Sequence, residues 1–450
     1  MRTPALALAL AILSGCAAYH AKPLRAPTLA ALKGPSHRAL VAAARALRVP
    51  GLASLPLDFR KPLTGKELGV IAVIADPALR ALRARERIAR AQVFAAGLLP
   101  DPVVRFGALK PYGVGASGRS VALSDGFLWD LSRLVTRSMD IRMARERAAQ
   151  VRYNVAWREW VTANEARLAA RQVYWLEAEW RIARKALALL GHHEPMLARD
   201  ASRHLIGGRQ LLFFQAAQDA LRMKAAALHR ALKAARITLN GQLGLPPWAP
   251  LRIARPAPLH GVRGAPRSLF RRAVSRRLDL VALVAAYRSA DEALLRAVLD
   301  QYPRLSLGAA GARNSSGVNE AGFQLSLVVP LFNANRGAVA IARARRAALF
   351  QDYVARLAKA RAQIYQLDTA QASLERELAG LRGRRASLAR TARAARAARA
   401  AHALGLVSYL TLMQELTAVE LKMTALRLSR AATTLALATA TATPWSKGRP

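Results

Sequence analysis

Two short segments with strand-like alternation lie close together in a chain whose remaining periodicity is helical. Residues 304–311 alternate apolar with small or polar positions, and residues 321–330 repeat this pattern. A loop rich in glycine, asparagine and serine, residues 311–322, separates them. No proline occurs between Pro330 and Pro444. The sequence therefore predicts a β-hairpin that leads into one very long helix.

The same arrangement occurs earlier in the chain. Residues 103–109 and 119–127 also alternate, with a Gly/Pro/Ser loop at 110–118 between them, and helical periodicity follows. The copies are offset by about 200 residues, as from Pro102 to Pro303. Each copy continues from its long helix through a glycine turn into a returning helix. The sequence thus predicts a tandem duplication and a mainly α fold with a small β part.

Further breaks in the pattern divide the chain. Asp76-Pro77 is typical of a helix start, and Gly191 and Pro195 are expected to kink or interrupt the first long helix. One helix is expected over residues 268–299, and a proline-rich stretch at 246–250 links the copies. The predicted divisions are a signal peptide (1–15), an extended N-terminal segment with one short helix (16–75), repeat one (76–245), an equatorial linker (246–265), repeat two (266–442) and a tail (443–450).

The N-terminus resembles a lipoprotein export signal. Arg2 precedes an apolar run that is shorter than the ~20 residues needed to span a bilayer, and the run ends in Leu13-Ser14-Gly15-Cys16. This motif resembles the bacterial lipobox, which implies cleavage before Cys16 and lipidation of Cys16. An ordinary signal peptide with a chance cysteine is the alternative. Because Cys16 is the only cysteine, an internal disulfide is excluded.

The charge is strongly positive. The chain has 70 Lys and Arg against 27 Asp and Glu, a formal net charge of +43, which is typical of proteins that meet nucleic acid or anionic membranes. The arginines are spread over most helices, and aromatic residues for base stacking are scarce where arginine is densest. We therefore predict no nucleic-acid partner; a basic nucleic-acid-binding coiled coil remains a third hypothesis.

The alternation in the strands favours a pore wall, with apolar side chains toward lipid and Ser, Gln, Gly and Ala toward water. Four strands cannot close a barrel, and a membrane sheet tolerates no open edge. Other chains would have to complete it. A small soluble β-subdomain that caps a helical bundle is the alternative interpretation.

The segments YPRLSLGAAG and GFQLSLVVPLFNANRGAVAIARARRAA, within residues 302–348, and GLVSYLTLMQ, residues 405–414, resemble the TolC family of outer-membrane efflux factors. The resemblance covers about residues 76–440, and the lipobox is similar to that of lipoprotein members in metal and multidrug efflux. It implies a homotrimer whose strands form one twelve-stranded outer-membrane barrel, continued by a helical tunnel through the periplasm. Residues 110–118 and 311–322 would be extracellular loops.

The resemblance also implies partners and a function. The chain would be a passive export channel for metal ions or drugs, without enzymatic activity or cofactor. It would be supplied by a periplasmic adaptor protein and an inner-membrane pump, which the resemblance to lipoprotein members implies to be of the RND type. A periplasmic coiled-coil adaptor, or a structural lipoprotein without a pore, is the alternative function.

The glycine turns are the candidate binding sites. The resemblance implies that the turns contact the adaptor, through Gly207, Gly208, Gly405, Leu406, Val407 and Ser408; a plain structural turn is the alternative. Glycine is expected there because a tight helix reversal commonly needs a positive φ. Many relatives carry an acidic ring at the aperture just beyond the turn. Here the candidate aperture residues are Arg209, Phe213, Thr411 and Gln414, which favour a hydrophobic or basic constriction.

No catalytic or metal-binding motif was found in the sequence. His192-His193-Glu194 is the one compact ligand-like cluster, but it lacks a His pair at i and i+4 on one helix face. We therefore predict no metal site.

Overall fold

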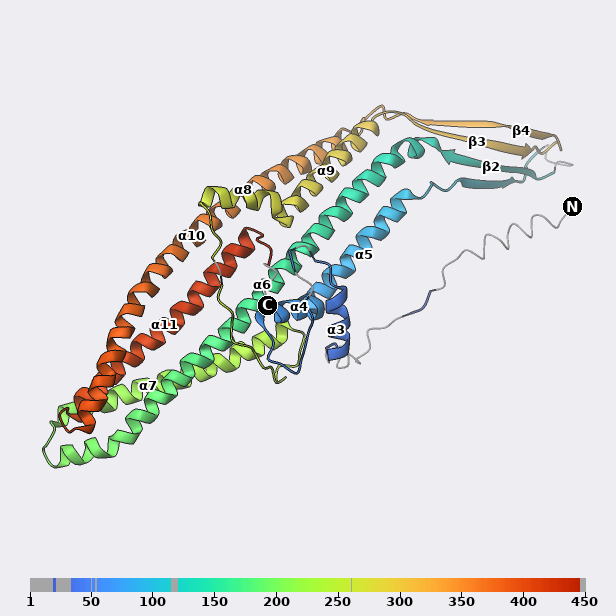
Figure 1. The fold of residues 1–450 in the computed structure, drawn as a ribbon. Coiled ribbons are helices and arrows are strands. Elements are labelled where there is room, and N and C mark those ends of the chain that lie inside the picture. Colours follow the sequence, from blue (N-terminus) through green and yellow to red (C-terminus); the bar gives the residue numbers. More distant parts are fainter. Residues whose placement is uncertain are drawn as a thin grey trace.

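The structure is a computed structural model that describes residues 19–21, 34–49, 51–52, 55–114, 120–259 and 261–445. The molecule is elongated (Figure 1). A β-sheet lies at one end, two helical turns lie at the other, and the segments near both termini pack in the middle (Figure 1). Cys16 and the predicted signal peptide lie outside the described residues.

The sheet has four antiparallel strands in the order β1-β2-β3-β4. The strands are β1 (Val103–Leu109), β2 (Ala122–Asp130), β3 (Arg304–Arg313) and β4 (Asn319–Val328). Both hairpins were expected from the sequence. The pairing of β2 with β3, two strands that are far apart in the chain, joins the two hairpins into one sheet.

Two strand boundaries differ from the prediction. The second strand was expected at 119–127, but β2 runs to Asp130, because Trp129 pairs with Leu307 and the Asp130 side chain caps the next helix. The loop expected at 311–322 is only 314–318, so the third strand extends beyond 311 and the fourth occupies 319–328 instead of 321–330. The Asn314 N–H donates to the Val318 carbonyl at 3.0 Å, and the Asn314 side chain accepts from the Val318 N–H. These bonds close the hairpin early.

Each strand pair leads into a long helix that runs to the far end of the molecule (Figure 1). The helix α6 (Leu131–Ser202) has 72 residues and α10 (Arg336–Ala400) has 65. At 1.5 Å per residue each is about 100 Å long. They return as α7 (Gly208–Gln242) and α11 (Leu406–Ala440). The order helix, hairpin, long helix and returning helix thus occurs twice.

Gly191 and Pro195 were expected to kink or interrupt this helix, and an interruption is absent, because α6 is continuous through both residues. A proline within a helix loses one N–H bond, and its ring crowds the carbonyl of the residue four positions earlier. That residue is Gly191, whose lack of a side chain gives the backbone room to adjust. The helix bends near this end instead of stopping (Figure 1).

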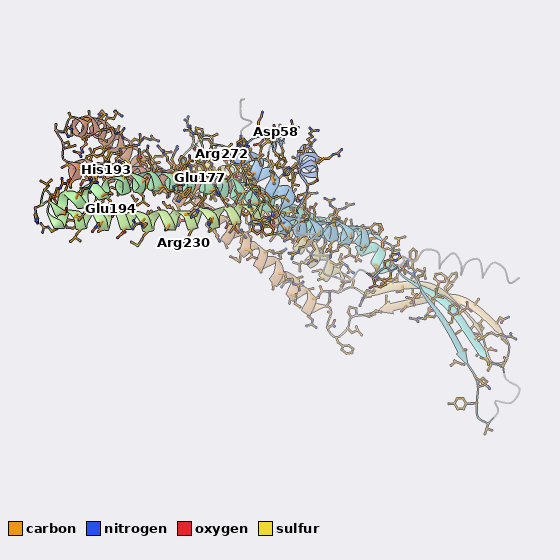
Figure 2. The ribbon with its side chains drawn as sticks, turned by 90° about the horizontal axis from the view of Figure 1, so that it is seen from below. Asp58, Glu177, His193, Glu194, Arg230 and Arg272 are labelled. Carbon is orange, nitrogen blue, oxygen red and sulfur yellow. The ribbon has the colours of Figure 1, made fainter. Side chains whose placement is uncertain are left out.

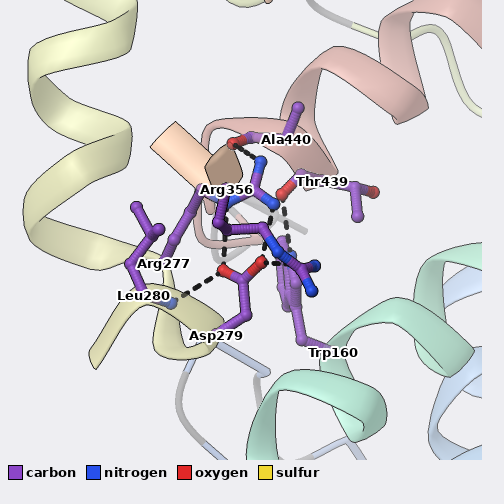
Figure 3. A network of polar contacts seen from close by, with 7 residues as sticks. All are labelled: Trp160, Arg277, Asp279, Leu280, Arg356, Thr439 and Ala440. Atoms are coloured by element: carbon purple, nitrogen blue, oxygen red, sulfur yellow. Dashed lines mark hydrogen bonds and ion pairs between the residues drawn. The ribbon is translucent and has the colours of Figure 1, made fainter. Parts of the chain in front are cut away.

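The helix expected over 268–299 is divided. The structure has α8 (Pro266–Arg276) and α9 (Leu278–Leu299), with Arg277 between them in an extended conformation at φ −70° and ψ 113°. The Arg277 guanidinium is buried and forms two bonds to Asp279, at 3.0 and 2.8 Å. Its third bond, at 3.2 Å, goes to the carbonyl of Ala440 (Figure 3). Burial of this polar group therefore fixes the break.

The N-terminal segment packs in the middle of the molecule. The expected short helix is α3 (His37–Ala46), and a second helix that was not expected, α4 (Gly65–Ala75), is almost wholly buried against α6. Thr64 and Glu67 form a capping box that starts α4. Leu63 pairs with Ile253 of the linker in a parallel bridge. From the middle, α5 (Pro77–Gly97) and α9 run toward the sheet (Figure 1).

Candidate functional site

The register of the four strands places most of the large apolar side chains of both copies on one face, which we call the apolar face. Val103, Leu109, Leu128 and Val328 lie on the other face, and Asp125 lies on the apolar face opposite Phe106. Val104 lies opposite Phe127, Phe127 opposite Ala309, and Ala309 opposite Phe323, so one row crosses the whole sheet. Phe106 is 83% exposed and Phe323 is 93% exposed. Other exposed members are Leu123, Leu307, Leu325 and Leu327. A contiguous exposed apolar surface of this kind indicates contact with another apolar phase.

The opposite face, the polar face, carries small and polar residues. They include Ser124, Gly126, Ser306, Gly308, Gly322, Gln324 and Ser326. Gly308 is required by the packing of the strands, since a Cβ there would collide with the main-chain carbonyl of Phe127 in β2. A Cβ on Gly126 would lie 2.9 Å from the Ala309 carbonyl oxygen. Small residues therefore let β2 and β3 approach closely.

Both outer edges of the sheet are open, because β1 and β4 each pair with one neighbour among the described residues. The sheet is curved when seen from below (Figure 2). An open edge presents unpaired main-chain N–H and C=O groups, which require partners in an apolar environment.

The two helical turns at the far end have the same backbone geometry. His204 and His402 each adopt a left-handed conformation with φ 59°. In each turn the next residue donates back into the helix: Leu205 N–H to Asp200 C=O at 2.9 Å, and Ala403 N–H to Ala398 C=O at 2.8 Å. This is the Schellman arrangement of a helix end.

The expectation that the turn glycines take a positive φ is therefore wrong. Gly207 and Gly405 have φ −70° and −64° and serve as the N-caps of α7 and α11. A Cβ on Gly207, Gly208 or Gly405 would meet nothing within 4 Å. The chain reverses at the two histidines instead. A histidine stands three residues before the turn glycine in each copy, and this repeated position is the sequence signal that could have identified the reversal.

The predicted tip residues differ in accessibility. Gly207, Gly208, Gly405 and Ser408 are exposed and Val407 is half-buried, whereas Leu406 is only 6% exposed. Leu406 packs in an apolar cluster that joins all four helices at this end, with Leu190, Leu197, Phe214, Ala395, Tyr409 and Leu410. This cluster holds the two turns together.

The predicted aperture residues lie on α7 and α11 just beyond the turns. Arg209 and Thr411 are exposed, and Phe213 is 69% exposed beside the equally exposed Leu212. Gln414 is half-buried and lines a mostly apolar cavity of about 320 Å³ between α6, α7 and α11. The Thr411 hydroxyl donates to the Val407 carbonyl at 3.0 Å. The end of the helices therefore presents apolar and basic side chains.

Solved structures with this architecture were found. CusC, solved in a study of transmembrane channel formation, is 16% identical with a TM-score of 0.69, over 88% of this chain and 96% of that one. The outer-membrane channel CmeC of Campylobacter jejuni is 12% identical with a TM-score of 0.71, over 89% and 92%. The MtrE outer-membrane channel of Neisseria gonorrhoeae, in its open state, is 17% identical with a TM-score of 0.68, over 88% and 94%. The chain has the fold of an outer-membrane channel protomer.

The fold class predicted from the resemblance to the TolC family is thereby confirmed. The open four-stranded sheet is part of this fold. No family model matches the sequence, and no curated protein matches it. Within the described residues, no helix has both the length and the apolar composition to cross a bilayer.

The His192-His193-Glu194 cluster lies toward the turn end of the protomer (Figure 2). In the part of the chain that the structure describes, no three His, Cys, Asp or Glu side chains come together as metal ligands. Glu194 instead accepts from the Gln218 amide at 3.0 Å. Burial lowers the pKa of His193, and the neighbouring His192 and Arg399 lower it further. The bond between Gln218 and Glu194 links α6 to α7.

Besides Asp279, two carboxylates are buried in the described helical part of the protomer. Glu159 of α6 accepts from the Arg83 side chain at 2.8 Å, and burial raises the pKa of Glu159 although Arg83 opposes this. Glu179, 20 residues further along α6, is buried and forms no ion pair among the described residues. Burial raises the pKa of Glu179, and Lys224 offsets part of that rise.

Proposed function

We propose that three copies of this chain form an outer-membrane export channel. The observation that carries the proposal is the segregation of the sheet into an apolar and a polar face, because a membrane barrel needs lipid outside and water inside. The open edges of β1 and β4 would pair with neighbouring copies, so that three sheets close a twelve-stranded barrel. The long helices would continue the passage as a periplasmic tunnel.

The chain is proposed to reside in the outer membrane with a lipid on Cys16 as an additional anchor. The lipobox at Leu13-Ser14-Gly15-Cys16 supports this assignment. A sheet already inserted in the membrane does not need the lipid for retention. The anchor would therefore serve mainly to hold the protomer at the membrane before the trimer closes.

Transport through the channel is proposed to be passive, with an inner-membrane pump, of the RND type, as the source of energy. A periplasmic adaptor would join the pump to the channel at the two helical turns. Exposure of Gly207, Gly208, Gly405 and Ser408 supports contact there, and side-chain-free backbone permits a close approach. Leu406 would contribute by packing the turn from inside.

Closure of the tunnel is proposed to use a hydrophobic or basic constriction near the turns. Arg209, Phe213 and Thr411 are exposed on the first turns of α7 and α11, and no acidic residue occupies the corresponding positions. In a ring made by these side chains, the positive charge of Arg209 would repel cations, whereas the uncharged Phe213 would not. Drugs or metal ions remain the proposed substrates, with metal ions expected to pass in complexed or screened form.

Planar-bilayer recording tests the proposal. The purified full chain in detergent should have the mass of three copies and should insert to give discrete conductance steps. A trimeric mass together with steps supports the channel. A monomeric mass without any conductance would contradict it and would favour the structural lipoprotein without a pore. Measurement of the mass and of the conductance in the same preparation separates failed assembly from a blocked passage.

A further inference from the structure

An open pocket of about 510 Å³ lies in the helical part, between α6, α10, α11 and the linker between the two copies. Five arginines line it, and no Asp or Glu is among its lining residues. They come from four separate segments: Arg171, Arg255, Arg382, Arg427 and Arg430. These five arginines differ from those spread along the other helices, because their side chains line one pocket.

The charge in this pocket is poorly compensated. Arg430 contacts Glu375 at 3.3 Å, whereas Arg255, Arg382 and Arg427 have no ion pair within the described ranges of the chain. Arg171 is half-buried, donates to the Ala257 carbonyl at 2.7 Å, and burial lowers its pKa to about 10. Five cations beside one carboxylate leave a strong positive potential in a partly desolvated hollow.

Aromatic residues supply a second, independent feature. Arg427 stacks over the Trp175 ring with 5.8 Å from its Cζ to the ring centroid. The Trp175 Nε1–H is buried and has no hydrogen-bond partner among the described residues. An indole N–H can only donate, and leaving it unpaired in the interior is unfavourable. Because this atom is buried, Trp175 bears on the pocket through the position of Arg427 and not through its N–H.

We propose that this pocket binds a soluble polyvalent oxyanion that carries phosphate or sulfate groups. Guanidinium forks match the oxygens of such groups in a bidentate manner. The volume accommodates a ligand larger than a single phosphate. The pocket lies in the helical part, away from the sheet, which favours a soluble anion over a lipid headgroup. The proposal does not depend on the export function.

Anion binding at this position would also couple the segments that build the pocket. The linker at Arg255 and Ala257, the long helix α10 at Arg382, and the returning helix α11 at Arg427 would share one ligand. Occupancy would therefore hold the middle of the protomer together, because mutual repulsion between the arginines is removed when the anion is bound.

Isothermal titration calorimetry with pyrophosphate, on the full-length protein in phospholipid-free detergent, tests the proposal. Saturable binding of one pyrophosphate per chain is expected at constant ionic strength. Arg382→Gln and Arg427→Gln should each weaken binding by at least about tenfold, since each removes a charge-assisted donor. Trp175→Phe should weaken it without changing the net charge, because phenylalanine is a poorer cation–π partner than tryptophan for Arg427.

Arg393→Gln is the matched control, because it removes the same charge as Arg382→Gln. Arg393 is exposed on the same helix as Arg382 and is not among the residues that line the pocket. It should leave the affinity within about twofold of the unmodified protein. An equal loss in Arg393→Gln and Arg382→Gln would overturn the site in favour of diffuse attraction. Absence of saturable binding to the unmodified protein would also overturn the proposed anion site. This holds even if the reason is that a neighbouring copy of the chain fills the pocket. Circular dichroism of each variant verifies folding. If an arginine variant does not fold, Trp175→Phe, which is a conservative replacement, still tests the pocket.

Discussion

Arg277 and Asp279 form a buried bidentate ion pair at the break between α8 and α9, with guanidinium to carboxylate distances of 3.0 and 2.8 Å. Asp279 also accepts from the Leu280 N–H at 3.1 Å, and Arg356 of α10 approaches it at 3.4 Å. Arg277 stacks over Trp157 of α6. It also donates to the Ala440 carbonyl at the end of α11 (Figure 3). One ion pair thus connects a helix break to three of the long helices.

Removal of Arg277 should strongly destabilise the protein. Arg277→Ala leaves Asp279 as a buried carboxylate with one weaker partner, which costs about 3–5 kcal/mol. Arg356→Ala removes a half-exposed partner and should cost less than about 1 kcal/mol. Thermal unfolding followed by circular dichroism compares the two variants. Equal midpoints would show that the ion pair does not determine the stability of this junction.

Gly308 should tolerate no side chain. In Gly308→Ala the new methyl group meets the Phe127 carbonyl in β2, so β2 and β3 must separate, at a cost of about 1–3 kcal/mol. Gly322→Ala, in β4, is the control because a Cβ there meets nothing within 4 Å. The fraction of oligomer that survives heating in detergent reports the difference. A heat-stable Gly308→Ala oligomer would contradict this account of the sheet.

Adjacent residues of β4 should respond differently to the same charge. Leu325 lies on the apolar face and Gln324 on the polar face. Leu325→Arg places a cation toward lipid, which costs about 2–4 kcal/mol near the middle of a bilayer, and should prevent insertion. Gln324→Arg should insert and alter ion selectivity. Fractionation into outer membranes, followed by conductance, measures both; equal insertion would argue against the proposed orientation of the sheet.

The turns should depend on the histidines rather than on the glycines. His402→Gly relieves a left-handed conformation and should stabilise the protein by about 0.5–1 kcal/mol. His402→Val should destabilise it by about 1 kcal/mol or more, because a β-branched residue resists a positive φ. Gly405→Ser should change stability by less than about 0.5 kcal/mol, since serine is a good N-cap. Chemical unfolding midpoints test the series, and a large loss in Gly405→Ser alone would restore the glycine requirement.

Glu179 should make the protein less stable as the pH rises. Burial raises its pKa in the folded state above the unfolded value, so the folded protein holds the proton more tightly. This contribution to stability is fully present below the unfolded pKa and is lost as the pH rises through the folded pKa. Glu179→Gln should therefore raise the unfolding temperature at pH 7 and leave it nearly unchanged at pH 4. A rise of the same size at both pH values would point to packing instead of ionisation.

Much of the architecture followed from local patterns. Alternation predicted both hairpins, proline-free periodicity predicted α10, and the offset between Pro102 and Pro303 predicted the repeated order of elements. These features depend on neighbours within one or two turns of the chain. The exposed positions of Gly207 and Gly405 next to helix ends were also predictable, although the backbone angle assigned to them was wrong.

The sequence by itself determined the elements of this protein and the apolar and polar side of each strand, because periodicity is a local property. Only the tertiary structure decided how these pieces join. The pairing of β2 with β3 aligned the apolar sides of both copies, burial of Arg277 divided a helix that its periodicity would continue, and the Schellman bonds placed the reversal at His204 and His402. Each outcome depends on hydrogen bonds or burial between residues far apart in the chain or on a backbone angle that composition does not specify. The five converging arginines likewise share a pocket only because four distant segments meet there.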